Sequence, residues 1–85
     1  MASYSVQIKR SAAKELERLP NKARRQIVKR IQELADDPRP PGSEKLTGDD
    51  LYRLRQGDYR VVYAIEDAVL TVLVIRVRHR REVYR

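Results

Sequence analysis

The 85-residue sequence has no cysteine, tryptophan or phenylalanine, and it has only three glycines and one histidine. Without cysteine the chain can form neither a disulfide bond nor a thiolate metal site, which is typical of proteins in a reducing cytoplasm. No N-terminal apolar run resembles a signal peptide, and no stretch approaches the roughly 20 apolar residues that span a bilayer. We therefore expect a soluble, cytoplasmic protein that makes no contact with a membrane.

Acidic residues are also in deficit, because 12 stand against 19 basic residues, and the formal net charge is +7. Such a balance favours acidic polymers or acidic protein partners. Arginine dominates the excess, and its planar, permanently charged guanidinium binds phosphate through paired hydrogen bonds. The composition indicates a phosphate-containing ligand. The plainer alternative is that the arginine stems cover apolar surface while their charged heads stay in water.

A single small domain over residues 1–85 is expected, because 41% hydrophobic and 36% charged residues in a chain of this length suit one modest core. Residues 3–8 alternate between apolar and polar side chains, which predicts a half-buried strand. Ser11 is placed to cap a first helix, and Pro20 is placed to end it.

A second helix is expected from a cap at Asn21 to Ala35, because apolar residues recur on one side of this stretch at helical spacing. Residues 36–43 contain three of the four prolines and predict a stiff, extended connection. Three further strands are expected at residues 51–56, 59–65 and 68–77. The sequence therefore predicts an α+β fold of order β-α-α-β-β-β, with a mainly antiparallel sheet and a helical pair packed on one face.

Gly57-Asp58 is expected to form the two-residue loop of a hairpin, since glycine suits the first central position of such a turn. The pairs would then be Gln56 with Tyr59, Arg55 with Arg60, and Arg53 with Val62, and paired residues share a face of the sheet. Three arginines, Arg53, Arg55 and Arg60, would project together, with apolar side chains on the opposite face. Because like charges placed opposite each other destabilise a sheet by a few tenths to roughly 1 kcal/mol, the cluster suggests a polyanionic ligand.

The last predicted strand is apolar from Val69 to Ile75 except at Thr71, which is typical of a central strand covered on both faces. Its apolar run therefore does not determine the face on which Arg76 and Arg78 lie.

Three segments together carry a resemblance: Lys45-Leu46-x-Gly48, then Leu51-Tyr52-Arg53-Leu54-Arg55-x-Gly57-Asp58-Tyr59-Arg60-Val61-Val62-Tyr63, then Val74-Ile75 with His79-Arg80-Arg81-Glu82-Val83-Tyr84. In this order and spacing the chain resembles the RelE branch of the RelE/ParE toxin superfamily over nearly its whole length. The resemblance implies a toxin of a type II toxin–antitoxin pair: a ribosome-dependent, metal-independent endoribonuclease that cuts mRNA in the ribosomal A site, inhibits translation and needs no cofactor.

The resemblance also implies roles for particular residues. Arg53 and Arg55 stand where the best-known members have two lysines of the active surface. Arg60 and Arg80 match two arginines, and Tyr84 matches a tyrosine near the C-terminus. We therefore expect Arg60, Arg80 and Tyr84 to be catalytic, and Arg53, Arg55 and Lys45 to bind RNA. His79, which departs from the family pattern, is added as a catalytic candidate because an imidazole suits acid or base work near neutral pH.

Metal-independent RNA cleavage requires a base for the 2′-hydroxyl proton, an acid for the departing 5′-oxygen, and fixed positive charge on the phosphorane between them. Arginine serves the third need but, with a pKa above 12, it transfers protons poorly near neutrality. Proton transfer should therefore fall to Tyr84 or to His79. Tyr84 is favoured as a base or as a stacking platform for a nucleotide, and His79 is the second candidate.

The resemblance further implies a cognate, RelB-like antitoxin that is partly disordered and folds as it wraps the toxin. The ribosome and mRNA are the other expected partners. Contact with DNA is expected only indirectly, through the antitoxin.

Three alternatives stand beside this hypothesis. The ParE branch shares the fold and inhibits DNA gyrase by protein binding without cutting RNA. A passive RNA-binding module is a weaker candidate, because no pair of aromatic residues in an exposed strand forms a stacking platform. A magnesium site built from acidic pairs is also weaker, because each pair falls at a predicted turn or helix end, where Asp is common for local reasons. The three pairs are Asp36-Asp37, Asp49-Asp50 and Glu66-Asp67.

Overall fold

The computed structural model describes residues 3–47 and 50–79, and the structural statements below concern these residues. Along the chain it contains strand β1 (Ser5–Ile8), helices α1 (Arg10–Glu17) and α2 (Asn21–Glu33), strands β2 (Ser43–Lys45), β3 (Leu51–Gln56) and β4 (Tyr59–Glu66), a 3₁₀ turn, η1 (Asp67–Val69), and strand β5 (Thr71–His79). None of the described helices is long and apolar enough to cross a membrane.

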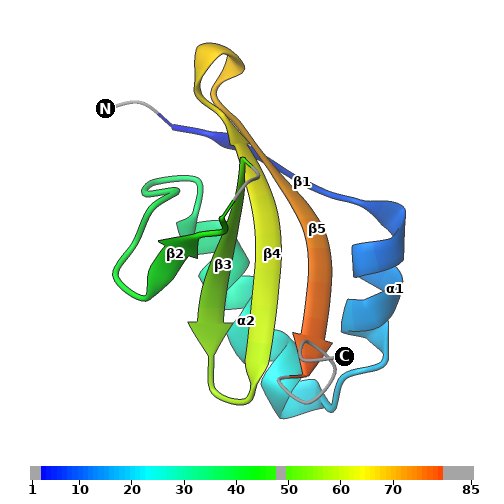
Figure 1. Ribbon diagram of the computed structural model, residues 1–85. Coiled ribbons are helices and arrows are strands. Elements are labelled where there is room, and N and C mark those ends of the chain that lie inside the picture. Colours follow the sequence, from blue (N-terminus) through cyan, green and yellow to red (C-terminus); the bar gives the residue numbers. More distant parts are fainter. Residues whose placement is uncertain (1–2, 48–49, 80–85) are drawn as a thin grey trace.

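The described strands form one five-stranded sheet in the order β1-β5-β4-β3-β2. Only β1 and β5 run parallel, and the other neighbours are antiparallel. In Figure 1, α2 lies behind the sheet and α1 lies beside β5. The predicted α+β class is confirmed, including the mainly antiparallel sheet.

The core lies between the helices and the sheet face turned toward them. Both helices and three strands contribute to one buried cluster: Ala12, Leu16, Ile27, Ile31, Leu34, Leu54, Val61, Tyr63, Ile65, Val72, Val74 and Val77. Burying a side chain of this kind contributes about 1.5–3 kcal/mol, so the cluster supplies the main driving force for folding. The helices thereby cover one face of the sheet, and the opposite face is not part of this core.

Several local expectations are corrected by the structure. Ser11 lies inside α1, and the cap residue is Lys9, which makes no side-chain cap hydrogen bond. Asn21 is the first residue of α2, and its Oδ1 accepts a hydrogen bond from Arg24 Nη2 at 2.6 Å rather than capping the backbone. These helix ends are held by packing of the apolar stripes on the sheet rather than by side-chain caps.

Strand β2 and the start of β5 also differ from the sequence prediction. β2 was not predicted, because a three-residue strand is too short to show a period of two. β5 begins at Thr71 rather than at residue 68, because η1 and a left-handed Leu70 (φ 47°) form the β4–β5 connection.

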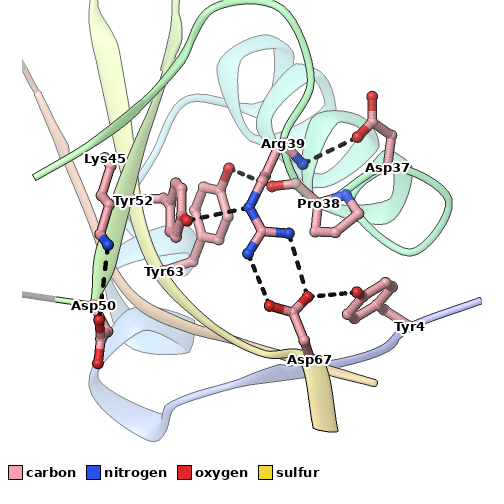
Figure 2. A network of polar contacts seen from close by, with 9 residues as sticks. All are labelled: Tyr4, Asp37, Pro38, Arg39, Lys45, Asp50, Tyr52, Tyr63 and Asp67. Carbon is pink, nitrogen blue, oxygen red and sulfur yellow. Dashed lines mark hydrogen bonds and ion pairs between the residues drawn. The ribbon is translucent and has the colours of Figure 1, made fainter. Parts of the chain in front are cut away.

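A polar network joins the proline-rich connection to distant parts of the chain (Figure 2). Arg39 donates from Nη1 and Nη2 to the two carboxylate oxygens of Asp67, at 3.2 and 2.9 Å, and from Nε to the Tyr52 hydroxyl at 3.1 Å. The Tyr4 hydroxyl donates to the same carboxylate at 2.6 Å. The Arg39 guanidinium holds the pKa of Asp67 below its usual value, and the bond to Asp67 raises the pKa of Tyr4.

Candidate functional site

The β3–β4 hairpin has the predicted two-residue loop. Arg55 is paired with Arg60, and Arg53 with Val62. Gly57 has a φ of +58°, a left-handed conformation that glycine adopts without steric cost. Arg53, Arg55 and Arg60 therefore share the face of the sheet that the helices leave uncovered, as the hydrophobic pattern predicted.

β5 adds two more arginines to this face. Arg78 is paired with Arg60, and Arg76 with Val62. We call this side, which carries Arg53, Arg55, Arg60, Arg76 and Arg78, the arginine face; it is turned toward the reader in Figure 1. Arg55, Arg60 and Arg78 form one row across three strands, which lie about 4.8 Å apart from neighbour to neighbour.

A β-bulge decides the orientation of the β5 arginines. Val62 is opposite Arg76, but Tyr63 is opposite Val74, so Ile75 is an extra residue in β5. Side chains alternate between the two faces of a strand, so the extra residue exchanges the faces for everything after it. Val77 is consequently buried (2% exposed) on the helix side, and its two arginine neighbours in the chain lie on the arginine face.

Arg60 lies at the centre of the row and is only 4% exposed. Two other cations of the arginine face, Arg53 and Arg78, each have a carboxylate partner. Arg53 Nη2 lies 3.3 Å from Glu44 Oε2, and Arg78 Nε lies 3.2 Å from Glu15 Oε2. The face therefore combines a buried central cation with two cations, Arg53 and Arg78, that carboxylates of neighbouring elements hold in place.

Lys45 and His79 do not lie with these arginines. Lys45 is paired with Tyr52, on the side of the sheet opposite Arg53, and its Nζ lies 4.0 Å from Asp50 Oδ1. His79 is paired with Tyr59, and their rings meet edge to face with centroids 5.3 Å apart. Because Tyr59 precedes Arg60 in the strand, His79 projects to the helix side.

A pocket of about 340 Å³ lies on that helix side, beside the end of α1. Both α1 and the ends of β4 and β5 contribute to its wall, which is lined by Glu15, Arg18, Leu19, Pro20, Tyr59, Val77 and His79. Tyr59, Val77 and His79 line the pocket from the side opposite the arginine row, and Glu15, in the same wall, contacts Arg78 at the edge of the sheet.

Arg80 and Tyr84, two of the predicted catalytic residues, lie outside the described residues. Of the acidic pairs, Asp67 is bound by Arg39, and no group of three or more potential metal ligands occurs among residues 3–47 and 50–79.

Sequence reasoning did not place Arg78 on this face and did not identify its contact with Glu15. The alternation Arg76-Val77-Arg78 was a signal that both arginines share a face. Only the bulge at Ile75 decided which face that is.

A small basic α+β domain with guanidinium groups on the sheet face that the helices leave uncovered has the charge distribution expected of a protein with a polyanionic or acidic partner. A family model described as "ParE toxin of type II toxin-antitoxin system, parDE" matches residues 6–84. The chain therefore belongs to the RelE/ParE family of toxins of type II toxin–antitoxin systems.

Its relatives place it with the RelE-type toxins, as the sequence resemblance predicted. It is 39% identical over 85 residues to Toxin RelE of Mycobacterium tuberculosis, with 96% of this chain and 87% of the relative covered. It is 34% identical over 86 residues to mRNA interferase toxin RelE of Escherichia coli K12, with 96% and 90% covered. The archaeal RelE–RelB complex from Pyrococcus horikoshii superposes with a TM-score of 0.83 at 33% identity, covering 92% of this chain and 96% of that chain.

Proposed function

We propose that this chain is an endoribonuclease that cleaves mRNA in the ribosomal A site, without a metal ion, and thereby inhibits translation. The observation that carries the proposal is the row Arg55–Arg60–Arg78, in which a buried guanidinium stands between two others on the sheet face opposite the helices. A similar protein, 34% identical, is named an mRNA interferase toxin, which supports the same chemistry.

In the proposed reaction the 2′-oxygen of one nucleotide forms a bond to the adjacent phosphorus while the bond from phosphorus to the 5′-oxygen breaks. A base takes the 2′-hydroxyl proton and an acid supplies a proton to the 5′-oxygen, which leaves a cyclic phosphate and a 5′-hydroxyl. Negative charge accumulates on the phosphorane oxygens between these events. Preorganised cations aimed at that charge lower the barrier, since they need no reorganisation during the reaction.

Arg60 is assigned to the phosphorane because its burial limits solvent screening and its central position puts cations on both sides of it. Arg80 is proposed to share this task, on the strength of the family resemblance. Arg53 and Arg55 are proposed to bind the flanking phosphates. We assign proton transfer or base stacking to Tyr84. We leave His79 out of the reaction because its side chain projects to the helix side.

The test is single-turnover cleavage of mRNA on programmed ribosomes by Arg60→Ala and Arg80→Ala. Loss of a preorganised cation of this kind should lower the rate by about 10²–10³-fold. Arg25→Ala, which removes one charge from the exposed side of α2, is the matched control and should cut at the wild-type rate. Unchanged cleavage in both site variants would remove the assignments.

The description of the family model favours a second candidate, a ParE-like toxin that inhibits DNA gyrase by protein binding without cutting RNA. A gyrase supercoiling assay run beside the ribosome assay separates the two. Codon-dependent cuts with normal supercoiling support the nuclease. Inhibited supercoiling with intact mRNA would replace it.

We also infer a RelB-like antitoxin as the partner of this chain, together with the ribosome and mRNA. Support comes from the P. horikoshii relative, whose structure is a RelE–RelB complex. The net charge of +7 favours an antitoxin with acidic segments. Such a segment would be partly disordered alone and would fold on the toxin.

A further inference from the structure

Arg78 occupies a position in the row that corresponds to that of Arg55. The two residues lie directly opposite Arg60, one on each side of it. A phosphate held at Arg60 would therefore have a guanidinium on both sides. Like charges placed opposite each other in a ladder destabilise it by a few tenths to about 1 kcal/mol, so a contact that holds an outer guanidinium offsets part of that cost.

Glu15 on α1 supplies that support for Arg78. Its Oε1 accepts a hydrogen bond from the backbone amide of Val77 at 2.9 Å, and its Oε2 lies 3.2 Å from Arg78 Nε. The amide needs this partner because the pairing of β1 with β5 ends at Val74, where Lys9 donates to its carbonyl. One carboxylate thus completes the edge of β5 and orients the arginine beside it.

The contact leaves the far end of the guanidinium available. A guanidinium carries five N–H donors, and the ion pair engages Nε, the nitrogen nearest the stem. The side chains of Arg78 and Glu15 are 33% and 23% exposed, so the pair is partly shielded from solvent while the arginine stays accessible. Among the described residues the two terminal nitrogens of Arg78 have no hydrogen-bond partner, and they can bind two oxygens of one phosphate.

We propose that Arg78 binds a backbone phosphate next to the scissile one, and that Glu15 is the residue that positions it. The inference rests on the proposed nuclease function and deepens it. It adds Arg78 to the residues of the row that contact phosphate. It also assigns a role in substrate binding to α1, the helix that packs beside β5.

The first test replaces Arg78 and uses the full chain with ribosomes programmed with mRNA. Arg78→Gln should lower kcat/KM for cleavage by about ten- to a hundredfold, the effect of losing one charge-assisted hydrogen-bonded contact. Binding to ribosomes whose A-site codon carries 2′-O-methyl groups, and so cannot be cut, should show a salt dependence weaker by about 0.7 in the log–log slope. Arg78→Lys keeps the charge without the fork of donors and should fall between wild type and Arg78→Gln.

The second test asks whether Glu15 acts through Arg78. Glu15→Gln keeps an oxygen that can accept the Val77 amide but removes the charge that holds the guanidinium. It should lower the cleavage rate at saturation while the salt slope stays at the wild-type value, because Arg78 is still present. In an Arg78→Gln background the same change should have no further effect on cleavage. Independent, multiplicative losses in the double variant would overturn the positioning role.

The controls separate this inference from the proposed function. Thermal unfolding checks that each variant is folded, and Arg25→Ala, a charge removed from the helical side, should keep the wild-type rate at saturation. If the wild-type chain cuts no RNA, or if Arg60→Ala cuts normally, the proposed function fails. If Arg60→Ala is inactive while Arg78→Gln matches wild type in rate and salt slope, only the role of Arg78 is overturned.

Discussion

Tyr63 shows how one hydroxyl group fixes a loop to the core. Its ring is fully buried, and its hydroxyl donates to the carbonyl of Pro38 at 2.8 Å (Figure 2). The ring stacks on Tyr52 with centroids 5.9 Å apart, and Arg39 lies over the other ring at 5.2 Å. Burial raises the pKa of Tyr63, because the phenolate would lose its hydration.

We expect Tyr63→Phe to lower the free energy of unfolding by about 1 kcal/mol at neutral pH, because the buried Pro38 carbonyl loses its donor. The folded pKa of Tyr63 is raised, so above about pH 10 the unfolded chain releases a proton that the folded chain keeps. Wild-type stability should therefore fall as the pH rises through that range, and the variant lacks this component. Urea unfolding between about pH 7 and 11 should show the two stabilities converging. A gap that stays constant with pH would contradict the prediction.

At the level of elements, the β5 bulge matters most. The apolar run before Arg76 is consistent with either orientation of the arginines, and the hydrophobic pattern alone cannot locate one extra residue. In the structure the register shift at Ile75 decides the orientation of the arginines, because it puts Val72, Val74 and Val77 together in the core. If β5 alternated regularly through Ile75, Arg76 and Arg78 would face the helices and Val77 would face the opposite side. Burying an unpaired charge in this way costs several kcal/mol.

Deletion of Ile75 tests this account. Removing the extra residue keeps Val74 opposite Tyr63 and Arg76 opposite Val62, so the ladder becomes regular with the same faces. The variant should still fold cooperatively, with a loss of about 1–2 kcal/mol for the missing side chain. Deletion of Leu73 is the matched control. It lies within the regular ladder, exchanges faces for part of β5 and should abolish cooperative unfolding in urea. Equal effects of the two deletions would refute the role of the bulge.

At the level of the whole molecule, positive charge lies on two sides. The arginine face occupies one side of the sheet, and the exposed surfaces of the helices carry further basic residues, among them Lys14, Lys22, Arg25 and Lys29. Substrate RNA requires only the first of these surfaces in the proposed reaction. A partner that wraps the molecule could use both, which fits an antitoxin with acidic segments.

Expression of the chain alone should therefore arrest bacterial growth, and co-expression of its cognate antitoxin should restore it. Growth curves after induction measure both effects, and Arg60→Ala is the matched control, since it should be tolerated without the antitoxin. Normal growth with soluble, folded wild-type chain would count against a toxin that needs neutralising.

The sequence by itself determined the α+β class, the hairpin register and the grouping of Arg53, Arg55 and Arg60, because alternation and turn chemistry are local and act within a few residues. Only the tertiary structure decided the side on which Arg78 lies, its contact with Glu15, and the separation of His79 and Lys45 from the arginine face. Those outcomes depend on one bulge and on packing between elements far apart in the chain. Neither the bulge nor this packing produces a periodic pattern in the sequence, because the free energies that determine them come from contacts between elements in the folded chain.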